Sequence, residues 1–279
     1  MSRRVDAHHH VWDLAVRDQP WTADLPPLRR SFALDELAPE LDREDVGSTV
    51  VVETVNVFEE GVELLALAAS SPRVAGVVAW MDLTAPDVAQ QIDQLRDGPG
   101  GDALVGVRHG VQAEPDPAWL CGREVRRGLA AVAAAGLAFD LLVVPAQLPA
   151  AVEAARVLPD MRFVLDHAGK PRIAEGGHDR WARDLRTLAG CENVAVKMSG
   201  LVTEAGPDWS AERIAPYAAT VLDAFGPGRV LYGSDWPVCL VDAGYAEVAA
   251  LARTLVADLS AAEQADVFGE NAVRWYGLA

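Results

Sequence analysis

The sequence predicts an α/β fold, a single-domain (β/α)8 TIM barrel with an extra helix near its C-terminal end. Three observations support this prediction: eight short apolar runs, a segment of helical period between successive runs, and no linker or composition break along the 279 residues. The alternative topology is a doubly wound open sheet, and the count of eight strands favours the barrel. We therefore expect one domain over residues 1–279.

The eight predicted strands are rich in Val, Leu and Ala and are nearly continuous in apolar residues. This pattern is typical of parallel strands that are buried on both faces, because an exposed face would alternate with charge. The predicted strands are Arg4–His10, Ser48–Asn56, Val74–Met81, Ala103–His109, Leu137–Val144, Arg162–His167, Asn193–Ser199 and Arg229–Asp235.

The segments between these runs have the spacing of amphipathic helices, and a short helix is expected before the second strand. The predicted helices are Leu34–Leu41, Glu59–Ala69, Pro86–Arg96, Arg123–Ala135, Pro149–Val157, Asp179–Leu188, Ala211–Phe225 and Tyr245–Ala257. A last helix over Ser260–Tyr276 begins with Ser260 and Glu263 in the spacing of a capping box, in which each side chain caps the other residue's backbone N–H.

Composition narrows the classes of partner. The chain has 41 Asp and Glu against 24 Lys and Arg, a net charge of −17. Nucleic acids and anionic membranes bind basic surfaces, so we expect neither as a partner and expect a small-molecule substrate instead. Cys121, Cys191 and Cys239 are scattered and form no CxxC pair, and the N-terminus lacks the apolar run of a signal peptide. These features predict a cytoplasmic protein.

Three predicted strands end in residues that can carry chemistry. His8 and His10 lie two positions apart and therefore share one face of the first strand, whereas His9 points the other way. His167 ends the sixth strand and Asp235 the eighth, and catalytic groups in this fold come from the ends of different strands. Three histidines and an aspartate suit a divalent metal such as zinc, or an acid–base cluster without metal. A lone strand-end histidine is more often a hydrogen-bonded core residue, but four such groups on three strands favour a functional site over a structural role.

Several segments along nearly the whole chain resemble the amidohydrolase superfamily, and in particular its branch of sugar-lactone and muconolactone-type hydrolases. The segments that carry the resemblance are Val5–Asp13, Gly106–Gln112 with Glu114-Pro-Asp116, Val164–Pro171, Val196–Leu201, Leu231–Pro237 and Phe268–Tyr276. The resemblance implies a (β/α)8 barrel and a hydrolase that opens a sugar-derived lactone, such as L-fuconolactone or L-rhamnonolactone, to its hydroxy acid.

The resemblance also bears on the metal. It places His8 and His10 at the family's positions on the first strand, His167 at its later strand-end histidine and Asp235 at its aspartate on the eighth strand. These four residues are the candidate site for one divalent ion, with Zn²⁺ the candidate. Members with two metals carry a bridging lysine on a middle strand, and no lysine occurs in the fourth or fifth predicted strand. Some members of the lactonase branch work without metal, so the resemblance leaves metal dependence open, and it implies no organic cofactor.

Opening a lactone requires an activated water, a donor at the carbonyl oxygen and a proton for the leaving alkoxide. Asp235 is one candidate base, and Glu204, in the loop beyond the seventh strand, is the other. A solvated loop carboxylate is the alternative interpretation of Glu204. Candidate substrate contacts are Arg108, His109, Gln112, Lys197, Trp12, Trp80 and Trp236.

Two of these contacts have alternatives of their own. Arg108 and His109 are adjacent on a strand, so we expect only one of them to face the pocket. The alternative for Arg108 is a buried pair with an acidic neighbour such as Asp140, and Lys197 shares this ambiguity. Each tryptophan taken singly is more often a loop-packing residue than a substrate contact. Together they favour a pocket for a small ring.

Two other functions compete with the lactonase. One is a metal-dependent decarboxylase of aromatic acids from the same superfamily, which would need a cationic pocket; the acidic balance argues against it. The other is a catalytically silent barrel that binds a ligand, although stability alone does not require the cluster of His8, His10, His167 and Asp235. The sequence contains no GxSxG, HExxH or GxxxxGK[ST] motif, which argues against serine-nucleophile and nucleotide chemistry.

Overall fold

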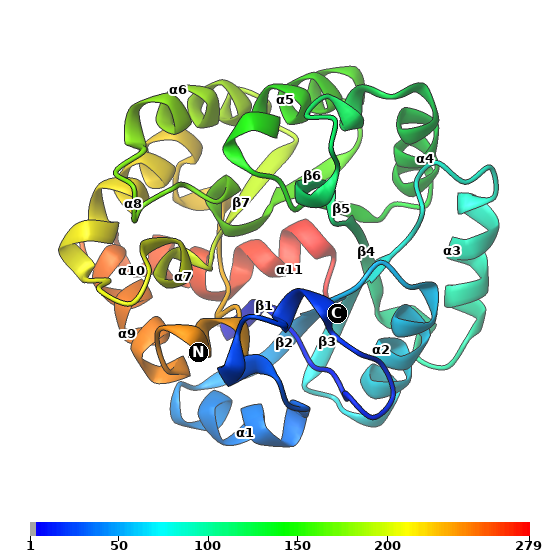
Figure 1. Ribbon diagram of the computed structural model, residues 1–279, viewed down its shortest axis with the longest axis horizontal. Coiled ribbons are helices and arrows are strands. Elements are labelled where there is room, and N and C mark those ends of the chain that lie inside the picture. Colours follow the sequence, from blue (N-terminus) through cyan, green and yellow to red (C-terminus); the bar gives the residue numbers. More distant parts are fainter. Residues whose placement is uncertain (1–3) are drawn as a thin grey trace.

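The computed structural model describes residues 4–279 and has the predicted (β/α)8 barrel (Figure 1). Eight strands pair in parallel and in sequence order from β1 to β8. The strands are β1 (Arg4–His9), β2 (Val46–Val52), β3 (Val74–Trp80), β4 (Leu104–His109), β5 (Ala138–Leu141), β6 (Arg162–Leu165), β7 (Val194–Met198) and β8 (Val230–Tyr232). Most of them end before the predicted boundary, and the residues beyond each end belong to the loops at the carboxyl ends of the strands.

The barrel closes between β1 and the segment that follows β8. The backbone N–H of His10 donates to the Trp236 carbonyl at 2.7 Å, and that of Asp235 donates to the His8 carbonyl at 2.8 Å. His9 and Trp236 form the parallel bridge between them. Because these hydrogen bonds join the end of the first strand to the last, they hold Asp235 beside the two histidines that share its side of the barrel.

Most of the helices surround the barrel and cover its outer face, and α11 lies at one end of it (Figure 1). They are α1 (Leu34–Arg43), α2 (Phe58–Ser70), α3 (Val88–Asp97), α4 (Arg123–Ala134), α5 (Leu148–Val157), α6 (His178–Ala189), α7 (Leu201–Ala205), α8 (Ala211–Phe225), α9 (Tyr245–Leu255), α10 (Ala261–Ala265) and α11 (Asn271–Tyr276). All the predicted helices form, and the short α7 was not predicted.

The helix predicted over Ser260–Tyr276 is divided. It begins with the predicted capping box, in which the Ser260 hydroxyl accepts from the Glu263 N–H at 3.3 Å and the Glu263 carboxylate accepts from the Ser260 N–H at 2.8 Å. A π-helical segment over Asp266–Glu270 then separates α10 from α11. The wider turn is a change of helix type that the apolar spacing did not predict.

Helix α11 closes the amino-terminal end of the barrel, and Figure 1 shows it in the middle of the ring of strands. Ala272, Tyr276 and Leu278 pack against the inward-facing residues of the strands, among them Val5 and Val105. The end of the barrel opposite the site is therefore filled with side chains, and a ligand can approach only from the carboxyl ends of the strands.

No helix among residues 4–279 is long and apolar enough to cross a membrane. Cys121, Cys191 and Cys239 are all free thiols. The cytoplasmic location and the single-domain extent over residues 1–279 stay predictions, and residues 1–3 of that range lie outside the described part of the chain.

Candidate active site

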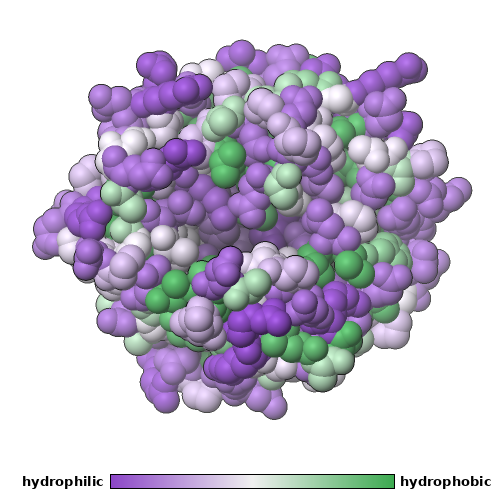
Figure 2. Space-filling view, viewed as in Figure 1, coloured by the Kyte–Doolittle hydropathy of each residue, from purple (hydrophilic) through white to green (hydrophobic). Residues whose placement is uncertain are grey.

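A cavity of about 380 Å³ opens at the carboxyl ends of the strands, and Figure 2 shows the hollow, lined in hydrophilic colours, at the centre of this face. Its described lining residues are contributed by β4 and by the segments that follow several strands. They are His10, Pro20, Trp21, Glu53, Thr54, Val55, Asn56, Arg108, Gly110, Gln112, Ala113, Leu142, His167, Lys170, Asp235 and Val238. This is the face on which catalytic residues of a (β/α)8 barrel occur.

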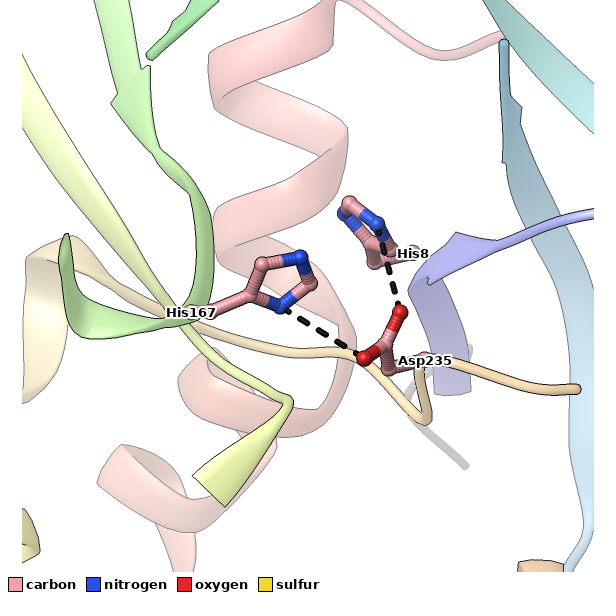
Figure 3. Close-up of side chains that lie close together, drawn as sticks. All are labelled: His8, His167 and Asp235. Atoms are coloured by element: carbon pink, nitrogen blue, oxygen red, sulfur yellow. Dashed lines mark ion pairs between the residues drawn. The ribbon is translucent and has the colours of Figure 1, made fainter. Parts of the chain in front are cut away.

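Three histidines and one aspartate meet at the floor of this cavity, and Figure 3 shows three of them, His8, His167 and Asp235. The Nε2 atoms of His8 and His10 lie 3.2 Å apart. Asp235 Oδ1 lies 3.7 Å from His8 Nε2 and 3.6 Å from His10 Nε2, and Asp235 Oδ2 lies 3.9 Å from His167 Nδ1. The structure therefore brings together all four residues that the sequence singled out at its strand ends.

Hydrogen bonds fix the orientation of the His10 ring. Its Nδ1 lies 2.8 Å from the Val52 carbonyl oxygen. A carbonyl only accepts, so Nδ1 carries the proton, and in the neutral ring Nε2 presents a lone pair to the cluster. His9 points away, with its Nε2 2.9 Å from the Thr49 hydroxyl. This alternation agrees with the spacing of the three histidines on β1.

The backbone at two of these residues is left-handed. His167 has a φ of 51° and Asp235 a φ of 58°, and such conformations cost about 1–3 kcal/mol for residues other than glycine. Gly200, with a φ of 66°, lies against the His167 ring, and a Cβ atom there would be 2.7 Å from His167 Nδ1. The strained turns and the close glycine direct both side chains into the cavity.

Burial and neighbouring charges separate the pKa values within the cluster. Burial lowers the pKa of His167 to about 4, so its ring is neutral near pH 7. Burial acts to raise the pKa of Asp235, but the adjacent histidines, His167 foremost, hold it well below its usual range. Asp235 is therefore a carboxylate at neutral pH.

The donor set fits one divalent ion. His8, His167 and Asp235 offer ligand atoms within 4.8 Å of one another, and His10 Nε2 lies beside them. Asp235 Oδ1 is buried and has no hydrogen-bond partner among residues 4–279. Zinc–nitrogen bonds of about 2.0–2.1 Å in a tetrahedral site separate neighbouring donor atoms by roughly 3.3 Å, close to the spacing of the two Nε2 atoms.

A second possible metal group, formed by His8, Asp140 and Asp166, holds a lysine instead. Lys197 Nζ lies 2.5 Å from Asp140 Oδ2, 2.9 Å from Asp166 Oδ1 and 3.0 Å from His8 Nδ1, and it is fully buried. Burial opposes ionisation of Asp166, but Lys197 and the neighbouring cations hold its pKa well below its usual range. Lys197, predicted as a substrate contact, therefore lies beneath the cluster as an internal cation, with no place for a second metal.

Arg108 faces the cavity, as the sequence predicted for one of the two residues at the end of β4. Its Nε donates to Glu53 Oε1 at 2.7 Å, its Nη1 donates to Asp166 Oδ2 at 3.1 Å, and its Nη2 donates to the Glu53 carbonyl. The suggested partner Asp140 instead binds Lys197. Burial raises the pKa of Glu53 to about 7, although the charge of Arg108 opposes the shift.

The sequence interpretation missed Glu53. The predicted strand ran through Asn56 and enclosed this residue, whereas β2 ends at Val52 and leaves Glu53 at the cavity wall. The available signal was a carboxylate directly after three consecutive valines, which is the same pattern of a polar residue ending a buried strand that identified the other site residues.

The predicted contact residues divide into two groups. Gln112 lines the cavity, but His109 does not: its ring stacks on Trp119 with centroids 4.3 Å apart, and its Nε2 lies 2.7 Å from Glu114 Oε1. Trp80 also does not line the cavity, and its Nε1 donates to His109 Nδ1 at 3.1 Å. Both rings belong to an aromatic cluster outside the cavity, because His109 and Arg108 extend to opposite sides of β4.

Trp12 and Trp236 are buried and pack against Phe32, with ring centroids 5.0 and 5.5 Å from it. The cavity wall instead contains Trp21, whose ring lies edge-on to Trp12 at 5.6 Å. Trp12, Trp80 and Trp236, which the sequence selected as contacts, are not among the described lining residues of the cavity, whereas Trp21 in the long segment after β1 is.

Glu204 lies on α7, and it is not among the described lining residues of the cavity. Burial raises its pKa, and the positive charge of Lys170 acts in the opposite direction. The negative charge of Asp235 also raises it, so the two carboxylates are close enough to repel each other. Glu204 is therefore near both Lys170 and Asp235, and its role as a base stays a prediction.

Comparisons with known proteins agree with this geometry. A family model described as Amidohydrolase matches residues 5–278. The chain is 40% identical to an L-fucono-1,5-lactonase from Burkholderia multivorans, over 99% of this chain and 96% of that protein. It superposes with a TM-score of 0.95 on a crystal structure of an amidohydrolase from Burkholderia multivorans with bound zinc, at 38% identity over 99% of this chain and all of the other.

A more distant structure, 5-carboxyvanillate decarboxylase from Sphingomonas paucimobilis, has a TM-score of 0.68 at 15% identity over the full length of both chains, and this likeness shows the fold alone. The family match, by contrast, covers nearly the entire barrel, including every strand that contributes to the site. The chain belongs to the amidohydrolase family.

Proposed function

We propose that this protein hydrolyses a sugar-derived lactone, such as L-fuconolactone, to its hydroxy acid. The observation that carries the proposal is the Asp235 carboxylate, which lines the cavity between His8, His10 and His167 and leaves Oδ1 without a hydrogen-bond partner among the described residues. A carboxylate in this state is ready to accept a proton from a water molecule. The named lactonase relative, 40% identical over the full chain, supports this substrate class.

The remaining cavity residues suit a polar ring. Arg108 is held rigidly by two carboxylates and lines the cavity, so its free N–H groups are suited to orient the lactone carbonyl as negative charge develops on its oxygen. Thr54, Asn56 and Gln112 offer hydroxyl and amide groups to sugar hydroxyls, and Trp21 offers a flat apolar face. The substrate is neutral, which agrees with an acidic protein.

We also propose that His8, His10, His167 and Asp235 hold one zinc ion. When bound, zinc supplies a Lewis acid that lowers the pKa of water. The residues themselves perform the other tasks: the Val52 carbonyl keeps the His10 Nε2 lone pair directed at the group, and the strained backbone at Asp235 keeps its carboxylate there. The zinc-bound relative in the same fold supports this metal.

Replacing His10 is expected to reduce zinc binding. We expect about one zinc per chain in the purified protein and well below a tenth of that in His10→Ala, because tetrahedral sites lose affinity steeply with each ligand. Metal content measured by mass spectrometry after dialysis tests this. His9→Gln is the matched control, since His9 contacts Thr49 on the outer side of β1 and should retain the metal. Equal zinc in the two variants would contradict the proposed ligand set.

The decarboxylase alternative has less support. The structural likeness to a decarboxylase is at 15% identity and shows the fold alone. A catalytically silent barrel gives no reason for the left-handed backbone at His167 and Asp235.

The proposed function is tested by following acid release from five- and six-membered aldonolactones in weakly buffered solution. We expect release well above the spontaneous rate for at least one 6-deoxy sugar lactone, and a dependence on metal that is measured by repeating the assay after chelation. Carbon dioxide release from aromatic acids is measured in parallel. Decarboxylation without any lactone opening would overturn the proposal.

A further inference from the structure

We propose that Glu53 is the general acid that protonates the ring oxygen of the lactone as it leaves. This inference rests on the proposed function and assigns one step of it to a residue at the end of β2. The leaving group of an aldonolactone is an aliphatic alkoxide, a poor leaving group that needs a proton as the bond breaks. A hydrolase of this class therefore needs a proton donor in addition to the base that activates water.

The position of the Glu53 carboxyl suits this role. Glu53 lines the cavity, yet only 2% of its surface is exposed, so the group meets a ligand rather than bulk water. Its Oε1 accepts from Arg108 Nε at 2.7 Å, which fixes the side chain. No hydrogen bond among residues 4–279 uses its Oε2, and this atom is also not one of the fully enclosed polar atoms that lack a partner. Oε2 is therefore free to face a bound substrate.

The charges around Glu53 come from three elements. Arg108 of β4 favours the carboxylate, and His10, which follows β1, acts in the same direction. The negative charge of Glu60 of α2 disfavours the carboxylate form of Glu53, and burial disfavours that form most strongly. The net effect is a pKa of about 7, so a substantial fraction of Glu53 carries a proton at neutral pH.

Glu53 and Asp235 line the same cavity but have different partners. Glu53 Oε1 accepts from Arg108 Nε, whereas the Asp235 carboxylate lies among His8, His10 and His167. Two carboxyl groups in separate environments of one cavity are the pattern of an acid and a base that act in one reaction.

The proposed step balances in atoms and charge. The water oxygen forms a bond to the carbonyl carbon, and the water proton passes to Asp235. The bond between the carbonyl carbon and the ring oxygen then breaks, and the Glu53 proton moves to that oxygen to give the new hydroxyl. The product is a carboxylic acid that ionises in solution, and exchange with solvent returns Asp235 to the carboxylate and Glu53 to the acid.

The decisive experiment compares Glu53→Gln on two lactones of different leaving group. The amide keeps the size of the side chain and keeps an acceptor for Arg108 Nε, but it has no proton to donate. With an aldonolactone we expect kcat/KM to fall by about 100-fold or more, within the range of general acid catalysis. With dihydrocoumarin, whose leaving group is a phenolate with a conjugate acid of pKa about 10, we expect a fall of less than about 10-fold.

Glu60→Gln is the matched control. Glu60 is a second buried carboxylate near the same wall, but both of its oxygens are occupied: Oε2 accepts from the N–H groups of Thr54 and Val55 at 2.9 and 3.1 Å, and Oε1 accepts from the Thr54 hydroxyl. Its role is to position the loop after β2. Because the charge of Glu60 also raises the pKa of Glu53, the comparison is made well below pH 7, where Glu53 keeps its proton in both proteins. There we expect Glu60→Gln to change the rates on the two lactones by similar factors.

A second measurement needs no variant. For the native protein, kcat/KM on the aldonolactone should fall above about pH 7, where Glu53 loses its proton, whereas kcat/KM on dihydrocoumarin should lack this alkaline limb. Equal losses on both lactones in Glu53→Gln, no loss on either, or the same alkaline limb on both substrates would overturn the Glu53 proposal. Failure of the native protein to open either lactone would instead overturn the proposed function.

Discussion

Asp235→Asn is expected to lower kcat for lactone hydrolysis by about 1,000-fold or more. The substitution keeps the size of the side chain but removes the negative charge, so the group no longer accepts a proton from water and is a weaker member of the proposed zinc ligand set. The measurement is the steady-state rate of acid release at neutral pH, with circular dichroism to confirm that the barrel is folded.

Glu204→Gln is the control for this prediction. Glu204 is not among the described lining residues of the cavity, so we expect a change in kcat of less than about 10-fold. The two variants separate the two candidate bases that the sequence left open. A large loss in Glu204→Gln together with a small loss in Asp235→Asn would reverse the assignment.

Lys197→Met is expected to destabilise the fold by about 3–5 kcal/mol, because it removes one member of a fully buried ion-pair network. Asp140 and Asp166 would then face each other without the ammonium group that lies 2.5 and 2.9 Å from them. The methionine chain fills a similar volume, so lost packing contributes little. Urea unfolding of the native protein and the variant measures the difference in the free energy of unfolding.

The double variant Lys197→Met with Asp140→Asn tests the cause of this loss. Removing one of the two uncompensated carboxylates should recover part of the lost stability, although Asp140→Asn alone is expected to destabilise. Such an interaction between the two substitutions identifies the charge as the origin of the effect. Simple addition of the two losses would show that Lys197 stabilises the barrel through packing instead.

The architecture was predictable because it depends on local patterns. Eight apolar runs and the helical segments between them are repeated along the chain, and each strand buries both faces, which leaves a signal in every run. The boundaries were less accurate at the carboxyl ends of the strands, where β2 and β8 end at Val52 and Tyr232. There the chain leaves the sheet for turns whose side-chain contacts come from other loops.

The direction of a site side chain was predictable where the alternation of side chains along a strand determined it. His8 and His10 share a face because side chains alternate along a strand, and the structure places their Nε2 atoms 3.2 Å apart. The same rule predicted that only one of the adjacent residues Arg108 and His109 would face the cavity. It did not extend to the tryptophans, since the wall position of Trp21 depends on how the segment after β1 folds back against Phe32 and α1.

The sequence by itself determined the barrel, the four residues at its carboxyl-terminal floor and the family to which the chain belongs. Only the tertiary structure decided which charged groups reach the cavity and which lie beneath it. Lys197 lies near the end of β7, and Glu53 directly follows β2. Lys197 is an internal cation between two aspartates, whereas Glu53 reaches the wall of the cavity. Their roles depend on partners 31 to 57 residues away in sequence, and pairings over that distance follow from the closure of the barrel rather than from any local pattern.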